Sequence, residues 1–408
     1  MSEWRETNFG EVIDVINGFA FKSSNFLENM VTNSLPIIKI KNVANGNVHL
    51  NGVQYHAYSE NLSKYIVKKG DVLIALTGNH PQAETQIVGL ASRYKVDRTA
   101  LINQRVAKVI SKNEETLSTD YIFYFLKDTN THLYLASRSS GSANQANISK
   151  SDIENIPFSL PPKNEQKAIA AILSSLDDKI DLLHRQNKTL EAMAETLFRQ
   201  WFVEEASVDW EEKPLGELLT ITSSKRIFYS EYVATGVPFY RSKEIIELHN
   251  TGNTKSELCI SANRFNEIQE KFGVPITGDI LLTSVGTLGI PYRVKKNDKF
   301  YFKDGNLTWF KDFTSIPSII IYCWLKSGIG KEQLDSITIG STQAALTING
   351  LKDIKLIIPP EDRIQALEEN LIFFYNKLDT NQVQIQTLET LRDNLLPKLM
   401  SGAVRVNL

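Results

Sequence analysis

The chain has 408 residues, which is too long for one hydrophobic core, so we expect two or more domains. Its 42% hydrophobic and 23% charged residues are typical of globular proteins and argue against pervasive disorder. A net charge of −2 and two cysteines exclude a strongly basic protein, a disulfide framework and a cysteine-rich metal site. Its N-terminus has no signal pattern, and no apolar run approaches the roughly 20 residues of a membrane span. We therefore expect a cytoplasmic protein.

Residues 1–160 mix strand-like runs, such as LPIIKIKNV and DVLIAL, with helix-like runs such as TDYIFYFLKD. This mixture predicts an α and β domain. A Gly-Asp turn enters one of the strands at Asp71, and the same pattern recurs at Asp279. We interpret both aspartates as structural, because no second carboxylate stands at a spacing suited to a metal ion or a nuclease.

Two Pro-Pro pairs mark the start of two long predicted helices. They lie in LPPKNEQKAI and IPPEDRIQAL, and roughly 38 residues in heptad spacing follow each pair. Pro162 and Pro360 suit the first helical position, where a missing N–H costs nothing. Pro397 and Gly402 are expected to break the second helix, after which the chain would fold back towards the first domain.

The heptads of the two helices predict one antiparallel coiled coil. If Asn187 faces Asn381, every position a faces a position d. Arg392 then meets Leu176 in a poor layer, and we expect its guanidinium to reach outward to solvent. The seam residues are Leu173, Leu176, Ile180, Leu183, Asn187, Leu190 and Leu197 in the first helix, and Leu371, Phe374, Leu378, Asn381, Ile385, Leu388 and Leu395 in the second. The alternative is that each helix only covers its own domain.

The chain is an internal repeat. KID at 179–181 matches KLD at 377–379, and GDVLIALTG and GSANQANIS match GDILLTSVG and GSTQAALT in the same order. We therefore divide the chain into a domain (1–160), a helix (161–205), a second domain (206–358) and a second helix with a closing segment (359–408). The predicted fold is α+β and pseudo-two-fold symmetric.

The helical segments LPPKNEQKAIAAILSSLDDKIDLLHRQNKTLEAMAETLFRQWFVE and LRDNLLPKLMSGAVRV resemble those of the specificity subunits of type I restriction-modification systems. The resemblance implies two target recognition domains, each reading one half of a bipartite, asymmetric site in double-stranded DNA. It implies that the helices set the spacer and dock two methyltransferase subunits, with restriction subunits in the full complex. It also implies a chain without catalytic activity or a cofactor, whose partners use S-adenosylmethionine, ATP and Mg²⁺.

Polar clusters in each domain are candidates for contacting DNA. Arg and Lys suit guanine edges or phosphate, Asn and Gln suit adenine, and hydroxyl groups suit phosphate. The candidates are Lys22, Ser23, Lys39, Lys41, Asn79, Asn103, Gln104, Arg105, Arg138, Asn144 and Gln145 in the first domain, and Ser224, Lys225, Arg226, Tyr240, Arg241, Lys243, Thr287, Lys303, Asn306, Thr342 and Gln343 in the second. Any one of them could instead be an ordinary solvated loop residue.

The charge balance leaves a second function open. The first domain has 16 basic and 15 acidic residues and the second has 18 and 17, so each carries only +1. A protein that binds DNA alone usually has a larger basic excess. The balance therefore fits a DNA-reading subunit whose partners supply backbone contacts, or a scaffold that does not bind DNA. No phosphate-binding loop, dinucleotide motif or paired histidine spacing indicates an enzyme.

Overall fold

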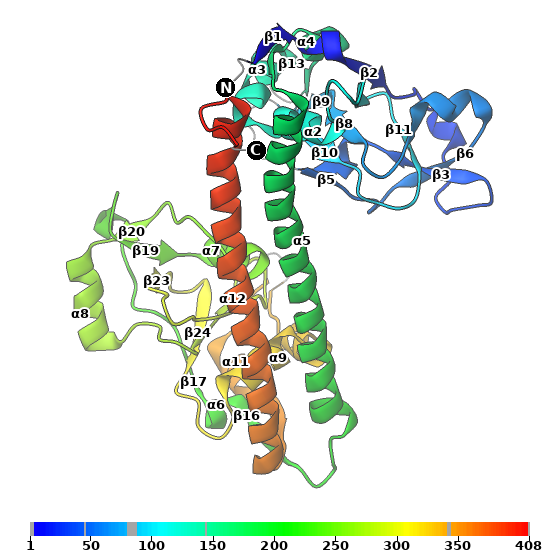
Figure 1. Cartoon of the computed structure of the whole chain (residues 1–408). Helices are drawn as coiled ribbons and strands as arrows, with labels where there is room; N and C mark the ends of the chain where they lie inside the picture. The colour runs from blue at the N-terminus through cyan, green and yellow to red at the C-terminus, as the bar shows by residue number, and fades with distance from the viewer. Residues whose placement is uncertain (1–3, 45, 80–87, 143–144, 341–343, 407–408) are drawn as a thin grey trace. The chain divides into compact units, whose positions relative to one another are not determined.

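The computed structural model describes residues 4–44, 46–79, 88–142, 145–340 and 344–406, and the chain divides into two compact units (Figure 1). Unit 1 consists of Met1–Asp181 and Gln386–Leu408, and unit 2 consists of Leu182–Ile385. Two long helices, α5 (Lys163–Arg199) and α12 (Glu361–Met400), contribute to both units. The prediction of two mixed α and β domains with two long helices is confirmed.

Unit 1 contains two main sheets. The first has the strand order β2-β12-β8-β10-β5-β4, and the second has the order β6-β3-β11-β7. The strands of the first sheet are β2 (Ile13–Asn17), β12 (Val106–Ser111), β8 (Val72–Ala75), β10 (Ala91–Arg93), β5 (Gly46–Val48) and β4 (Val43–Ala44). Those of the second are β6 (Gln54–Ala57), β3 (Ser34–Ile38), β11 (Ala100–Ile102) and β7 (Ile66–Val67).

Smaller elements complete unit 1. Helices α2 and α3 contribute Tyr121 and Leu135 to the core, which also contains Leu173 from α5 and Leu399 from α12. The remaining elements are β1 (Arg5–Asn8) paired with β15 (Pro157–Leu160), β9 (Thr77–Gly78) paired with β14 (Gln145–Asn147), β13 (Ser140–Ser142), and the helices α1 (Phe9–Val12), α2 (Thr119–Lys127), α3 (Thr129–Arg138) and α4 (Lys150–Glu154).

Unit 2 repeats the central part of this topology. Its sheet β17-β24-β21-β22 has the same antiparallel pairings as β2-β12-β8-β10, and the sheet β18-β20-β19-β23 contains one parallel pair, as does its counterpart. The strands are β17 (Thr220–Thr222), β24 (Leu307–Lys311), β21 (Ile280–Thr283), β22 (Pro291–Arg293), β18 (Tyr232–Val233), β20 (Cys259–Ile260), β19 (Val237–Tyr240), β23 (Tyr301–Phe302), and the pair β16 (Glu211–Pro214) and β25 (Lys355–Ile358). The shorter helices are α6 (Leu215–Leu218), α7 (Ser242–Thr251), α8 (Ala262–Phe272), α9 (Ser318–Lys326), α10 (Gly328–Ser336) and α11 (Ile348–Asp353).

The two Gly-Asp turns have the same structure in both units. Asp71 accepts a hydrogen bond from the backbone N–H of Lys68 at 2.8 Å, and Asp279 accepts one from Ile276 at 2.9 Å. The glycine before each aspartate has a positive φ, near 100°, which favours glycine. The strands that follow, β8 and β21, are buried along their whole length. Both aspartates therefore shape turns into core strands, as predicted.

The ends of the long helices differ from the prediction in two places. Helix α5 begins at Lys163 and α12 at Glu361, so Pro162 and Pro360 lie just before the first helical residue. Each proline takes part in its helix only through its carbonyl group, which accepts a hydrogen bond from the first turn. The prediction that Pro397 breaks α12 is wrong. The helix continues to Met400, because the missing N–H of Pro397 removes a single hydrogen bond in the last turn. Gly402, with φ +71°, follows the end of the helix.

The seam of the helix pair can be followed in each unit. In unit 2 the Asn381 amide donates a hydrogen bond to the Asn187 side-chain oxygen at 2.8 Å, as the expected register requires. In unit 1 the expectation for Arg392 is wrong. Its side chain is only 17% exposed, and its guanidinium lies 3.0 Å from the Asp177 carboxylate. Asp177 is adjacent to Leu176 on α5, so it supplies a counter-charge beside the layer that looked unfavourable.

The segment after α12 returns to unit 1, as expected. The Arg405 guanidinium pairs with the buried Glu165 carboxylate at 2.5 Å, and the Trp4 indole donates to the same carboxylate at 3.0 Å. These hydrogen bonds hold the pKa of Glu165 below its ordinary value. Trp4 and Arg405, near the two ends of the described residues, are therefore both fastened to the start of α5.

Candidate nucleic-acid interface

The loops that carry the candidate residues of unit 1 are joined to one another by backbone hydrogen bonds. The N–H of Gln104 donates to the Phe19 carbonyl at 2.9 Å, and the N–H of Asn103 donates to the Ile38 carbonyl at 3.0 Å. Strand β9, which precedes Asn79, pairs with β14. Segments near residues 19–23, 38–41, 77–79, 102–105 and 145–147 are thus connected at the strand ends.

The candidate side chains of unit 1 differ in how accessible they are for a contact with DNA. Lys39 donates a hydrogen bond to the Gln54 side chain at 2.6 Å and lies over the Phe26 ring, and burial lowers its pKa. Asn103 and Asn79 are half-buried. Asn144 and the side chain of Gln145 lie outside the described residues. The exposed candidates are Lys22, Ser23, Lys41, Gln104, Arg105 and Arg138.

The candidate loops of unit 2 are connected in the same way. The Asn306 carbonyl accepts hydrogen bonds from the Ser284 N–H at 2.9 Å and from the Ser242 hydroxyl at 3.4 Å. The N–H of Lys303 donates to the Tyr240 carbonyl at 2.8 Å. These contacts join the segments near residues 240–243, 284–287 and 303–306. Thr342 and Gln343, from the predicted GSTQ loop, lie outside the described residues.

Some candidates in unit 2 are engaged within the protein. Arg241 forms an ion pair with Glu244 at 2.6 Å, and the Glu244 side chain is only 1% exposed. Tyr240 stacks on the Phe300 ring at 4.5 Å, and burial raises the pKa of its hydroxyl to about 12. Lys243 lies 3.9 Å from two carboxylates. The described candidates that remain exposed are Lys225, Arg226, Lys243, Thr287 and Lys303, with Ser224 and Asn306 half-buried.

One pair of contacts was missed from the sequence although the repeat could have indicated it. Lys95, after β10, bonds to Asp181 on α5 at 2.5 Å, and Lys295, after β22, bonds to Asp379 on α12 at 2.8 Å. Asp181 and Asp379 are the last residues of the matching KID and KLD motifs. We call these two ion pairs the clamp pairs, because each fastens a domain to a long helix at an equivalent place.

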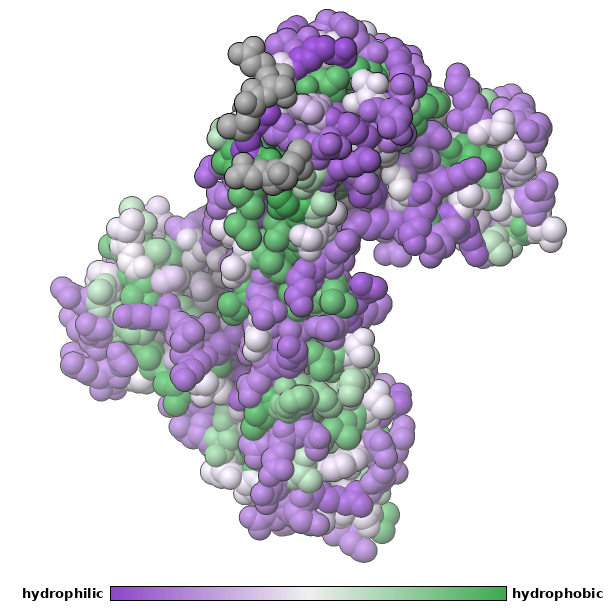
Figure 2. Space-filling view, in the orientation of Figure 1, coloured by the Kyte–Doolittle hydropathy of each residue, from purple (hydrophilic) through white to green (hydrophobic). Residues whose placement is uncertain are grey.

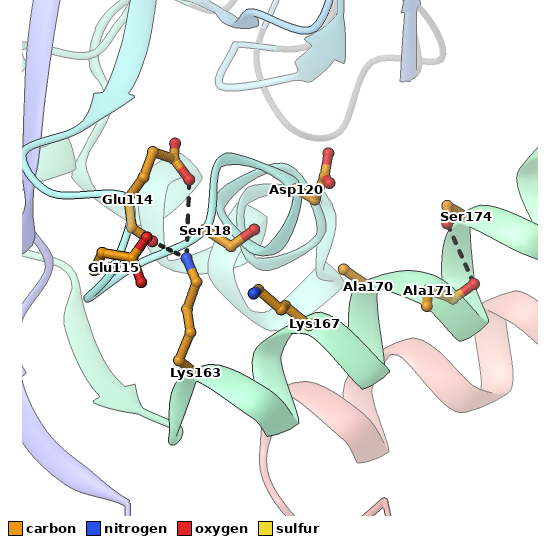
Figure 3. A pocket seen from close by; sticks show the side chains of 9 residues that line it. All are labelled: Glu114, Glu115, Ser118, Asp120, Lys163, Lys167, Ala170, Ala171 and Ser174. Atoms are coloured by element: carbon orange, nitrogen blue, oxygen red, sulfur yellow. Dashed lines mark hydrogen bonds and ion pairs between the residues drawn. The ribbon is translucent and has the colours of Figure 1, made fainter.

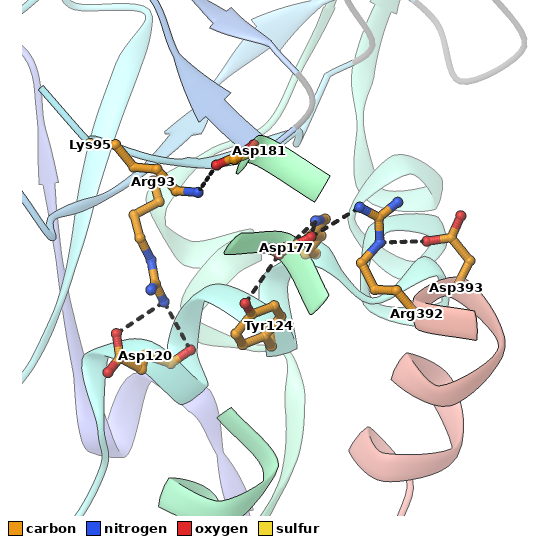
Figure 4. Close-up of polar contacts among 9 residues, drawn as sticks. Arg93, Lys95, Asp120, Tyr124, Asp177, Asp181, Arg392 and Asp393 are labelled. Atoms are coloured by element: carbon orange, nitrogen blue, oxygen red, sulfur yellow. Dashed lines mark hydrogen bonds and ion pairs between the residues drawn. The ribbon is translucent and has the colours of Figure 1, made fainter. Parts of the chain in front are cut away.

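A second fastening occurs in unit 1 (Figure 4). The Asp177 carboxylate on α5 contacts Lys127 at 3.3 Å, Arg392 at 3.0 Å and the Tyr124 hydroxyl at 3.0 Å. Burial disfavours the charged carboxylate, but the two cations and the hydroxyl outweigh that effect and hold the pKa of Asp177 below its ordinary value. This network joins α2, α5 and α12.

Hydrophobic side chains remain exposed on both long helices, and Figure 2 shows them interspersed with polar residues. They are Ile172, Leu182, Met193, Ile372, Phe373, Val383 and Leu391. In unit 2 a groove of about 520 Å³ lies between the helices, and it is lined by Leu182, Arg185, Gln186, Thr189, Leu190, Phe373 and Lys377. The apolar groove, rather than the scattered side chains, is the part of this surface that suits a contact with another protein.

Unit 1 has a groove of different character, with a volume of about 510 Å³ (Figure 3). It lies where α5 begins and is lined by charged and small residues. Lys163 bonds to Glu114, while Lys167 extends towards the start of α2. The positive and negative side chains occur together, so the groove does not select for an anion or a cation.

Two kinds of feature are absent from the described part of the chain. None of its helices is long and apolar enough to cross a membrane. No group of three or more His, Cys, Asp or Glu side chains in the same part is placed to hold a metal ion.

Comparison with known proteins points to one family. The family model described as the type I restriction modification DNA specificity domain matches residues 1–192 and again residues 207–390. Together the two matches cover nearly the whole chain, and they repeat once, in agreement with the duplicated topology.

Several individual relatives match over nearly their full length. The type I restriction enzyme MjaIX specificity subunit of Methanocaldococcus jannaschii is 25% identical, with 99% of this chain and 97% of the relative covered. The HindI specificity subunit of Haemophilus influenzae is 23% identical, with 99% and 100% covered. The crystal structure of the type I restriction-modification S subunit from M. genitalium has a TM-score of 0.64 at 18% identity and covers 97% of this chain and 96% of its own. That structure therefore shares the fold.

Proposed function

The chain belongs to the type I restriction-modification DNA specificity family, and on this premise we propose that it is the non-catalytic DNA-reading subunit of a type I restriction-modification complex. Residues 1–160 and 206–358 act as target recognition domains. Each reads one half of a bipartite, asymmetric site in double-stranded DNA.

The main support for this proposal is that the candidate loops of each domain lie together at the strand ends. In each unit, loops rich in Lys, Arg, Asn and Ser are connected at the ends of strands that have the same topology. Side chains of these types can contact both phosphates and base edges. The exposed residues of the two sets differ, since Gln104 and Arg105 in unit 1 have no matching pair in unit 2. The two half-sites should therefore be unequal.

We assign the helix pair two roles within this function. It sets the spacing between the half-sites, and its exposed apolar side chains dock two methyltransferase subunits. The partner subunits supply S-adenosylmethionine, ATP and Mg²⁺, and restriction subunits join the full complex. The near-neutral charge of each domain fits this division, because partner subunits would provide part of the phosphate contact.

Sequencing of native host DNA for methylated adenine tests the proposal directly. The gene is compared intact and deleted, with its partner methyltransferase expressed in both strains. We expect a split motif with a fixed gap to lose methylation upon deletion. An unchanged methylation pattern would contradict the proposal.

Two further measurements test whether each domain reads its own half-site independently, and whether the chain is instead a scaffold that does not bind DNA. Replacing residues 206–358 with those of a relative should change only one half of the motif, and a change in both halves would contradict the division into two readers. A scaffold that does not bind DNA would show no salt-sensitive DNA binding in the presence of the methyltransferase, whereas the DNA-reading subunit would show it.

A further inference from the structure

Two adjacent aromatic side chains in unit 2 are left in solvent. Phe228 is 62% exposed and Tyr229 is 89% exposed, while Ile227 beside them is buried in the core. They follow the exposed cations Lys225 and Arg226 in the loop between β17 and β18. Two adjacent large aromatic rings exposed to this extent form an apolar patch rimmed by polar residues, which is the kind of surface that binding sites use.

The loop that presents these rings is held in place. The N–H of Phe228 donates a hydrogen bond to the Glu231 carboxylate at 2.7 Å, and Arg264 on α8 forms an ion pair with the same carboxylate at 2.7 Å. The Tyr229 ring packs edge-on against Tyr232, 6.0 Å between centroids. The backbone that carries the two rings is therefore held in place, which reduces the entropy cost of ordering the loop upon binding.

The same loop adjoins the candidate interface of unit 2. The Arg226 guanidinium bonds to Asp304 at 2.8 Å, next to the exposed Lys303. The N–H of Lys225 donates to the Tyr301 hydroxyl at 2.7 Å, and its ammonium group lies over the Phe272 ring. Exposed aromatic rings beside several cations match nucleic acid, whose phosphates attract the cations and whose bases stack on the rings.

We propose that Phe228 and Tyr229 insert at a base step in the second half-site. In duplex DNA the base faces are covered by stacking, so an aromatic side chain reaches one only by partly opening a step. The described part of unit 1 has no aromatic side chain among its exposed large hydrophobic residues. Opening of a base step by an inserted aromatic side chain is therefore expected in the second half-site and not in the first. This inference rests on the proposed function.

The test uses the complex with its methyltransferase subunits and the DNA site found by methylation sequencing. The fluorescent base 2-aminopurine replaces adenine at successive positions, since its emission rises when stacking is lost. The methylated adenines are left out of the series, because a methyltransferase itself takes its target base out of the stack. At the other positions we expect a rise at one step in the second half-site and none in the first. The double variant Phe228→Ala, Tyr229→Ala should lose the rise and bind about 10-fold more weakly, since stacking on one base contributes about 1–3 kcal/mol.

Three variants separate insertion from other effects. Tyr229→Phe keeps the ring and should keep the fluorescence rise. Lys225→Ala should reduce the salt dependence of binding by about one phosphate contact and leave the rise in place. Val208→Ala, at a fully exposed position in the segment after α5, should change neither quantity.

The outcomes are distinct. If the wild-type complex recognises its site but shows no rise in the second half-site, or if the double alanine variant keeps both rise and affinity, the inference is overturned and the proposed function stands. If the complex shows no sequence-specific DNA binding, the proposed function fails and the inference fails with it.

Discussion

Replacing Asp177 with alanine should destabilise unit 1 by about 3 kcal/mol. The carboxylate lies between Lys127 and Arg392, whose side chains are only 14% and 17% exposed. Removing one partner of a buried ion pair costs about 3–5 kcal/mol, because the remaining charge stays buried without compensation. Arg392 keeps its ion pair with Asp393 at 2.9 Å, so we take the lower value.

Thermal unfolding of unit 1, monitored by hydrogen exchange of its peptides, measures this effect. In a unit of about 200 residues, 3 kcal/mol corresponds to a midpoint about 6–12 °C lower. Asp178→Ala is the matched control, since this neighbour on α5 is exposed and its loss should cost less than about 0.5 kcal/mol. Equal midpoints for the two variants would refute the view that Asp177 compensates buried charge.

Three further predictions concern the helices and their fastenings. Asn187→Leu alone should destabilise the protein by about 1–3 kcal/mol, because it leaves the Asn381 amide unpaired. The double variant with leucine at both positions should be more stable than wild type, because the buried Asn381 side-chain oxygen already lacks a partner among the described residues. Thermal unfolding measures both variants. Since the pKa of Asp177 is lower in the folded state, its contribution is complete above about pH 5 and disappears as the pH falls through the folded pKa. The difference in unfolding midpoint between wild type and Asp177→Asn should thus become smaller as the pH is lowered from 6 to 3. A difference that stays constant over this range would contradict the reasoning. Lys95→Asp should cost about 1 kcal/mol, and adding Asp181→Lys should recover it in a double-mutant cycle.

The parts of the fold that the sequence predicts are those in which neighbouring residues determine the structure. Heptad spacing alone predicts the two long helices, and one asparagine in each is enough to choose a register that places Asn187 against Asn381. The Gly-Asp turns are equally local, because the glycine and the aspartate that form each turn are adjacent in sequence.

The environment of Arg392 could not be predicted from the helices. Its heptad position indicates only which residue it faces, Leu176, whereas the compensating carboxylate is one residue further along. The second cation, Lys127, comes from a domain with no heptad pattern. A prediction from the seam alone therefore omits both Asp177 and Lys127, the two charges from outside the seam that surround this layer.

The same limitation applies to the candidate interface. Arg241 and Lys225 look alike as basic residues in polar loops, but only the structure shows that Arg241 is paired with the buried Glu244. Phe228 and Tyr229 would be assigned to the core on composition alone, and their exposure appears only once the loop is placed. Local sequence identifies the loops, and tertiary contacts decide which side chains in them remain available.

The clamp pairs bear on how such a chain can evolve. Each clamp is shared between two stretches of sequence, with the lysine in a domain and the aspartate in a long helix. Because both helices carry the aspartate at the same repeat position, a domain that brings its own lysine meets the same partner in either copy. Recombination at the Pro-Pro boundaries could thus exchange one whole domain for another while the joint to the helix is kept.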